Sequence, residues 1–317
     1  MLALSLTLTA CGEADADAPV SDSTTPTIVA STNIWGDVVA NVACGGLATV
    51  DVLTPPGADP HAFEPSLADR GRLEAAALVV ANGLGLEERF EDTLESVESS
   101  GTPVFYIAEH IDTIEIADDG HSDGHGQSGG HTHDHGHAHE GDDPHVWFDP
   151  LRVSAALPLL AEHLVEDAGL DADAVDDCMT AYQRELAEVH HELEHLFEDI
   201  PEARRLLVTN HDALGYLADR YVFQVVGTVI PSTSTLAEPN AADLEALAKT
   251  IEADKIPAVF TEALHSKDIV ESLATRVGNV QVVILYTDAL GEPGSGAETY
   301  IDLLRTNATR IRDALSK

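Results

Sequence analysis

Short apolar runs alternate with amphipathic segments along most of the chain. In the first half the runs are rich in Val, Ile, Leu, Phe and Tyr, so each predicts a buried strand. These strands are expected at 27–30, 47–53, 77–81 and 103–106. Between them, apolar residues recur three and four positions apart and predict helices at 33–42, 66–76 and 86–97. This alternation predicts a parallel sheet with helices on both faces.

The same alternation returns in the second half of the chain. Strands are expected at 205–209, 223–229, 258–261 and 280–285, and helices at 213–220, 241–253, 267–277 and 298–315. The predicted fold class is therefore α/β, with two doubly wound lobes that each hold a parallel sheet.

A helix at 153–168 and a longer helical segment, Ala174–Glu198, separate the two halves. The longer segment contains no Gly or Pro. At 1.5 Å per residue it would be about 37 Å long. It is expected to be a stiff strut between the lobes or an ordinary surface helix, with His190, His191 and His195 in solvent. One apolar stripe follows it: Tyr182, Leu186, Val189, Leu193 and Leu196.

These patterns divide the chain into four parts. Residues 1–26 form a signal peptide and tether, 27–170 an N-terminal lobe, 171–199 a linker helix and 200–317 a C-terminal lobe. At 317 residues and 44% hydrophobic composition, the chain is long enough for two globular lobes.

The composition is strongly acidic. Asp and Glu number 56 against 16 Lys and Arg, for a formal net charge of -40. Without a basic surface to meet phosphates, nucleic acid is excluded as a partner. Such a surface concentrates cations, or it reflects adaptation to a salty medium; the sequence leaves both open.

The N-terminus predicts export. Residues 1–10 are small and apolar, and Leu8-Thr9-Ala10-Cys11 resembles a bacterial lipobox, in which cleavage precedes Cys11 and its sulfur is lipidated. One departure is that no Lys or Arg precedes the apolar run. No later run of about 20 apolar residues predicts a bilayer span. We expect a lipid-anchored protein on the outer face of the cytoplasmic membrane, or a periplasmic one.

Export bears on the two remaining cysteines, Cys44 and Cys178. In an oxidising compartment two thiols tend to pair. A Cys44–Cys178 disulfide and two unrelated buried thiols both remain open from the sequence.

A His-rich loop at 120–142 predicts accessory metal binding. Neutral imidazole suits zinc, copper and nickel rather than magnesium or calcium. The loop has almost no apolar side chains for a packed core, so a solvated linker is the alternative. Its candidate ligands are His121, His125, His131, His133, His135, His137 and His139.

Four other positions follow, or nearly follow, predicted strands beside turn residues: His61, His145, His211 and Asp288. Each alone is more typical of a hydrogen-bonded structural residue. Ligands in doubly wound sheets bind beyond the carboxyl ends of the strands. Because two positions come from each half, they are expected to meet in a cleft between the lobes.

Two motifs carry a resemblance to a known family. Residues 55–65 read Pro-Pro-Gly-Ala-Asp-Pro-His-Ala-Phe-Glu-Pro, and residues 143–150 read Asp-Pro-His-Val-Trp-Phe-Asp-Pro after the His-rich loop. Over residues 27–317 the chain resembles cluster A-I metal-binding lipoproteins, the substrate-binding components of bacterial zinc or manganese ABC importers. The resemblance implies two α/β lobes on a long rigid helix with little hinge closure, a membrane permease as partner and a monomer. It also implies the metal ligands His61, His145, His211 and Asp288.

Three imidazoles and a carboxylate suit tetrahedral zinc. In manganese members of the resembling family the third position usually carries a carboxylate, whereas this chain has His211. Zinc is therefore expected rather than manganese. Four nearby residues are expected to orient or enclose the ligands, with plain core packing as the alternative for the tryptophan: Asp59, Glu64, Trp147 and Asn210.

The expected function is zinc capture and delivery to an ABC permease, with no catalysed step. One rival is a zinc hydrolase with Glu262 as general base, which a fourth protein ligand argues against. Another is an adhesin-like surface lipoprotein that buffers zinc and needs no permease.

Overall fold

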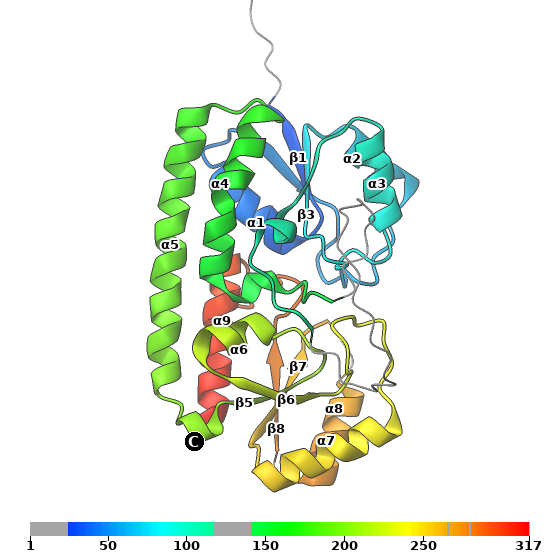
Figure 1. Ribbon diagram of the computed structural model, residues 1–317, viewed down its shortest axis with the longest axis vertical. Coiled ribbons are helices and arrows are strands. Elements are labelled where there is room, and N and C mark those ends of the chain that lie inside the picture. The colour runs from blue at the N-terminus through cyan, green and yellow to red at the C-terminus, as the bar shows by residue number, and fades with distance from the viewer. Residues whose placement is uncertain (1–24, 117–140, 265–266, 279, 317) are drawn as a thin grey trace, which may run out of the picture.

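The protein has two α/β lobes, one above the other in Figure 1, with a long helix along one side. The computed structural model describes residues 25–116, 141–264, 267–278 and 280–316. Cys11 and the seven histidines expected as accessory ligands lie outside these residues. Within the described ranges, no helix combines the length and apolar character needed to cross a bilayer. The two-lobed α/β class predicted from the sequence is confirmed.

The N-terminal lobe is built on one parallel sheet of four strands in the order β2-β1-β3-β4. Its strands are β1 (Thr27–Ala30), β2 (Thr49–Val52), β3 (Leu78–Ala81) and β4 (Val104–Tyr106). Its helices are α1 (Asn33–Val42), α2 (Leu67–Glu74), α3 (Glu91–Ser99) and the short 3-10 helix η1 (Ile107–His110).

Successive strand residues point to opposite faces of this sheet, and each face packs against its own hydrophobic cluster. In β1, Ile28 and Ala30 join the main hydrophobic core, while Val29 joins a second cluster. That second cluster contains Leu73 of α2 and Leu94 of α3. The near-continuous apolar character of β1 thus follows from helices on both sides.

The C-terminal lobe has two parallel strand pairs, β5–β6 and β7–β8, with β5 next to β7. Its strands are β5 (Leu206–Thr209), β6 (Gln224–Thr228), β7 (Ala258–Glu262) and β8 (Gln281–Leu285). Its helices are η3 (Glu202–Arg204), α6 (Gly215–Tyr221), α7 (Ala241–Asp254), α8 (Asp268–Val277) and α9 (Tyr300–Leu315). One face packs on α7 and α8, and the other belongs to the main core.

Two helices and a 3-10 turn connect the lobes: η2 (Val146–Phe148), α4 (Pro150–Glu166) and α5 (Ala172–Glu198). At 27 residues, α5 is about 40 Å long. It begins two residues earlier than predicted because the Asp171 side chain accepts a hydrogen bond from the backbone N–H of Ala174 and caps it. It packs on α1 and α4 and also on α9, so it contacts both lobes (Figure 1).

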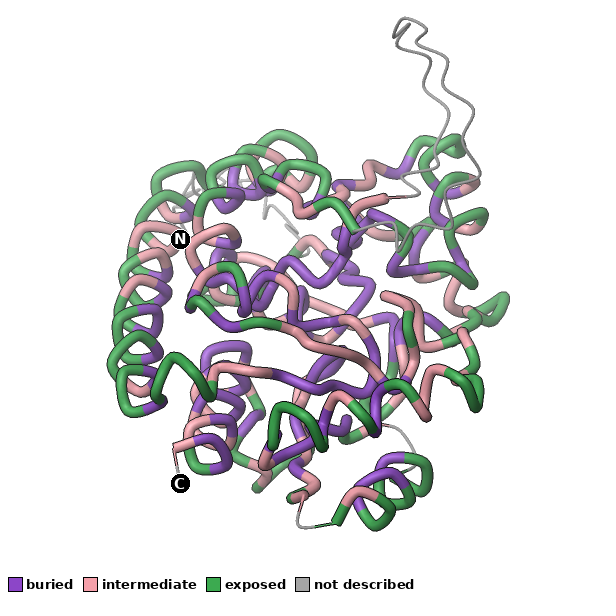
Figure 2. The backbone as a smooth tube through the Cα atoms, turned by 60° about the horizontal axis from the view of Figure 1, so that its bottom comes forward, coloured by how far each residue is buried: buried purple, intermediate pink, exposed green. Residues whose placement is uncertain are grey.

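One hydrophobic cluster runs through both lobes. It includes Ile28 and Trp35 of the N-terminal lobe, Leu186 of α5, and Phe260 and Leu304 of the C-terminal lobe. Figure 2 shows the buried backbone continuing through the middle of the molecule. Because close-packed interiors resist shear, this shared core limits movement of one lobe against the other.

A disulfide joins Cys44, just after α1, to Cys178 of α5, with the two Cα atoms 5.9 Å apart. The pairing that the sequence left open is therefore present in the structure. It fixes the long helix to the N-terminal lobe at one end.

The predicted helix at 86–97 is wrong at its start, because α3 begins only at Glu91. Gly83, Leu84 and Gly85 all have positive φ, which forms a turn before it. Glu87 lies buried in this region and accepts hydrogen bonds from two backbone N–H groups at the end of β3. Leu86 is buried in this turn rather than in a helix, so its apolar side chain does not mark the start of α3.

Candidate metal centre

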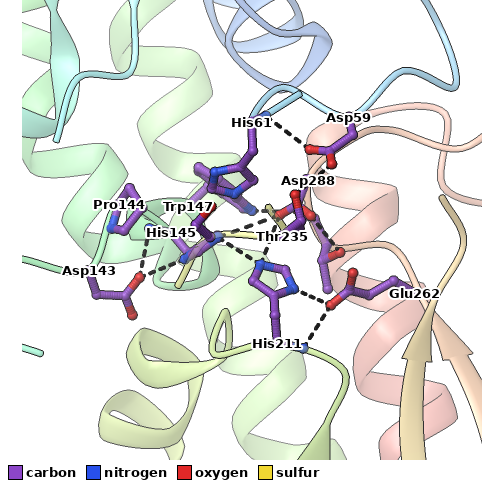
Figure 3. Close-up of polar contacts among 12 residues, drawn as sticks. Asp59, His61, Asp143, Pro144, His145, Trp147, His211, Thr235, Glu262 and Asp288 are labelled. Atoms are coloured by element: carbon purple, nitrogen blue, oxygen red, sulfur yellow. Dashed lines mark hydrogen bonds and ion pairs between the residues drawn. The ribbon is translucent and has the colours of Figure 1, made fainter. Parts of the chain in front are cut away.

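The structure brings together the four residues expected to form a site: His61, His145, His211 and Asp288. Each offers one nitrogen or oxygen atom, and these atoms all lie within 4.8 Å of one another. All four side chains are buried. Figure 3 shows them converging from separate segments between the two lobes. A second group of this kind lies on α5.

Each of these residues lies in a segment that connects two elements of secondary structure. His61 lies beyond β2 and His145 just before η2, while His211 follows β5 and Asp288 follows β8. Loops at the carboxyl ends of parallel strands are where α/β folds place ligands. The two lobes therefore contribute two residues each.

The spacing of the ligating atoms suits a small tetrahedral ion. His145 Nε2 lies 3.1 Å from His211 Nε2. Asp288 Oδ1 lies 3.6 Å from the first of these nitrogens and 3.8 Å from the second. With metal–ligand bonds of about 2.0–2.1 Å, the edge of a zinc tetrahedron is about 3.3 Å. Only a slight rearrangement would bring all three atoms onto one ion.

Several polar atoms here are buried without a hydrogen-bond partner among the described residues: both ring nitrogens of His61 and Oδ1 of Asp288. The Nδ1 atom of His61 has only a longer contact of 3.4 Å, to Glu88 Oε1. Buried polar groups are normally hydrogen-bonded, so such a cluster indicates groups that bind something. The donor set, imidazole nitrogen and carboxylate oxygen, fits a transition-metal dication.

Carboxylates orient two of the imidazoles from behind. Asp143 Oδ1 lies 2.7 Å from His145 Nδ1 and accepts the backbone N–H of His145 at 2.9 Å. Glu262 Oε1 contacts His211 Nδ1 in the same way (Figure 3). With the proton on Nδ1, each ring turns the lone pair of Nε2 toward the centre.

The recurring Asp-Pro-His sequence has a local structural meaning. Asp59 Oδ1 accepts the backbone N–H of His61 at 2.9 Å, as Asp143 does for His145. An aspartate two residues before the histidine therefore fixes its backbone. Asp59 also accepts a hydrogen bond from the Thr235 hydroxyl at 2.6 Å, which ties this loop to the C-terminal lobe.

Burial and charge set the protonation of the site. Burial lowers the pKa of His145 well below its usual value. Burial also opposes protonation of His211, but the carboxylates of Asp288 and Glu262 outweigh it and raise the pKa of His211 to about 9. Desolvation raises the pKa of Asp143 to about 7. At neutral pH, an ion entering here displaces a proton from His211.

The residues expected around the ligands have different surroundings. Trp147 is buried with its ring centroid 5.2 Å from that of His145, and its indole N–H donates to the Thr287 carbonyl at 2.9 Å. It encloses the site and packs in the core at once. Asn210 donates to Glu262 at 3.2 Å. Glu64, by contrast, is exposed and pairs with Arg89 at 3.1 Å.

Glu262 has a different role from the general base that the sequence suggests for a hydrolase. It accepts the backbone N–H of His211 at 3.3 Å and contacts the ring of that residue. The two residues are 51 positions apart, so no local motif joins them. The feature that points to this contact is the position of Glu262 at the end of β7, which lies next to β5, the strand before His211.

Glu262→Gln is expected to weaken metal binding about 10–100-fold, the usual effect of losing a partner behind a ligand. The amide keeps the shape but not the charge that holds the His211 ring. Competition titration against a zinc chelator measures the change. Glu64→Gln is the matched control, because that carboxylate is exposed and pairs with Arg89 rather than with a ligand. Equal affinity in Glu262→Gln and the unaltered protein would refute the orienting role.

Known proteins resemble this chain over most of its length. The family of the periplasmic zinc-uptake complex component A matches residues 28–314. The manganese-binding lipoprotein MntA of Halalkalibacterium halodurans is 28% identical over 317 residues, covering 100% of this chain and 97% of the relative. The zinc-binding protein TroA of Treponema pallidum is 29% identical over 297 residues, covering 92% and 89%.

A solved structure of the periplasmic zinc-binding protein TroA from Treponema pallidum has the same fold. It superposes with a TM-score of 0.79 at 28% identity, covering 93% of this chain and 100% of that one. The matches thus extend over both lobes and every described residue of the candidate centre. This chain belongs to the family of the periplasmic zinc-uptake complex component A, the metal-binding proteins that serve ABC importers.

Proposed function

We propose that this chain binds zinc between its lobes through His61, His145, His211 and Asp288 and delivers it to an ABC permease. The observation that carries the proposal is the convergence of four buried ligating atoms from both lobes. Three neutral imidazoles and one ionised carboxylate make a closed tetrahedral set, which suits zinc.

The choice of metal rests on the chemistry of the ligands, since relatives are named for zinc, manganese and iron. Manganese prefers oxygen ligands, whereas imidazole suits zinc. His211 provides a third nitrogen where a carboxylate would make a harder site. Manganese is the alternative cargo.

We further propose how the protein is placed in the cell. Cys11 carries the lipid anchor and residues 12–26 are the tether, so the protein is held at the outer face of the cytoplasmic membrane, with a periplasmic location as the alternative. The two lobes, 27–170 and 200–317, are joined by a linker at 171–199 in a monomer. The acidic surface and the His-rich loop at 120–142 concentrate zinc nearby.

No catalysed step belongs to this proposal. In a zinc hydrolase, three protein ligands leave a position for water, and a free carboxylate acts as base. Here Asp288 provides the fourth ligand and Glu262 is engaged by His211. A zinc-buffering surface adhesin remains a rival that needs no permease.

Metal analysis of the protein isolated without added metal, followed by competition between zinc and manganese, tests this function. About one zinc ion per chain, not displaced by excess manganese, is the expected result. A tight manganese ion that excludes zinc would overturn the choice of metal. Cells that lack the protein should lose zinc uptake if it serves an importer, and should keep zinc uptake if it only buffers zinc.

Deleting residues 121–139 is expected to remove only weaker zinc equivalents and to leave one tight equivalent. The deletion takes all seven histidines of the tract but none of the interlobe ligands. Calorimetric titration with zinc resolves the two classes of site. If the deletion abolished all binding, the interlobe centre would be wrong.

A further inference from the structure

A second group of ligating side chains lies outside the interlobe centre, on the long helix α5. His190, His191 and Glu194 each offer an atom, and the three atoms lie within 4.8 Å of one another. The side chains of His191 and Glu194 are 69% and 49% exposed, so solvent reaches the group. α5 forms the outer left edge in Figures 1 and 2. An ion therefore has free access to this position.

Helical spacing brings the three side chains together. Glu194 follows His190 by four residues and His191 by three, and both separations face one side of a helix. The same carboxylate oxygen, Oε2, lies 3.4 Å from His190 Nε2 and 3.0 Å from His191 Nδ1. These separations are close to the tetrahedral edge of about 3.3 Å for zinc.

His190 is held in place before any ion arrives. Its side chain is buried, unlike the two neighbouring ligands, and its Nδ1 lies 3.2 Å from the Tyr221 hydroxyl. The imidazole packs beside the tyrosine ring at 5.7 Å between centroids. Such an outer partner fixes which nitrogen faces outward, as it does for metal-ligating histidines in general. Nε2 is thereby directed at Glu194.

The charges around the group favour a cation. The positive charge of Arg220 acts on His190, but Arg220 pairs with buried Asp149 at 2.6 Å and is countered by it. Burial lowers the pKa of His190, and the hydrogen bond with His191 lowers the pKa of Glu194. The group thus offers two imidazole nitrogens and one carboxylate oxygen to an ion, with water for the remaining positions.

We propose that His190, His191 and Glu194 form a second, external site for a soft dication of the zinc, nickel or copper class. The site has three protein ligands against four in the interlobe centre, and two of them are exposed surface side chains, so it binds more weakly. It does not depend on which metal the importer carries. The expectation that these histidines are merely solvated is thereby revised for His190, which is buried.

Zinc titration of the full chain, and of the chain lacking residues 121–139, tests the external site after one tight equivalent has been loaded. The tract-deleted chain is expected to take up one further, weaker equivalent. That equivalent is lost in His191→Ala and in Glu194→Ala. In the full chain the same substitutions lower the total uptake by one. The tight equivalent remains in every variant, which separates this result from a failure of the interlobe centre.

His163→Ala is the matched control, because His163 of α4 pairs with Asp167 at 2.7 Å in the same i, i+4 arrangement, and no third ligand joins them among the described residues. It is expected to keep the weaker equivalent. Tyr221→Phe retains the ring and removes only the hydroxyl, so we expect about 10–100-fold weaker external binding. Unchanged uptake in His191→Ala and Glu194→Ala, or no second equivalent in the tract-deleted chain, overturns the proposal.

Discussion

Replacing His211 with alanine is expected to abolish tight zinc binding. A protein zinc site of four ligands is worth about 10–16 kcal/mol, so one ligand contributes about 3–4 kcal/mol, or roughly 10²–10³ in affinity. Competition titration with a fluorescent zinc chelator measures the effect.

His61→Ala is expected to behave in the same way, although the residue comes from the other lobe. The shared phenotype would show that both lobes contribute to one ion. Replacement of His163, a partly exposed histidine on α4, controls for loss of a histidine elsewhere. Wild-type zinc affinity in either site variant would be incompatible with the interlobe centre.

His211→Glu offers a finer version of the same experiment. A carboxylate in place of the third imidazole gives two nitrogens and two oxygens, which is the harder donor set that manganese prefers. Metal preference should therefore move toward manganese rather than vanish. The contrast with His211→Ala separates the identity of the donor from its mere presence.

Removing the Cys44–Cys178 disulfide is expected to lower the free energy of unfolding by about 2–5 kcal/mol. The bridge closes a segment of 134 residues, so reduction restores much conformational freedom to the unfolded chain. Denaturant unfolding of the Cys44→Ser, Cys178→Ser double variant measures the loss. Zinc affinity should hardly change, because neither cysteine lies among the ligands.

Reducing agent provides an internal control for the disulfide. It should destabilise the unaltered protein and have no effect on the double variant. If the two proteins unfolded at the same denaturant concentration before reduction, the bridge would not contribute to stability. The compartment matters here, since such bridges persist in oxidising surroundings.

Much of the fold could be predicted because burial leaves a local signature. β3 is apolar at every position, since helices cover both faces of its sheet, and it was placed correctly to within one residue. The start of α3 was misplaced because Leu86 is buried in a turn, and burial alone does not distinguish a turn from a helix. Helix ends depend on side-chain caps such as Asp171.

In the candidate site, too, local features can be predicted and distant contacts cannot. Local sequence alone singles out His61 and His145, because each stands in an Asp-Pro-His segment whose aspartate accepts the histidine backbone N–H. Glu262 differs, because its partner His211 is 51 residues away and their meeting depends on β5 lying beside β7. Glu64 was expected near the ligands from proximity in sequence, yet its side chain points to Arg89.

The apolar core that continues through both lobes has a consequence for how cargo leaves the protein. Whole-lobe opening would break that packing and strain the helix that contacts both halves. Release of a bound ion would then require local loosening of the ligand-bearing loops, for example at the Thr235–Asp59 contact, while the scaffold keeps its shape. A transporter would then have to distinguish loaded from empty protein by small rearrangements of the surface loops rather than by a change in overall shape.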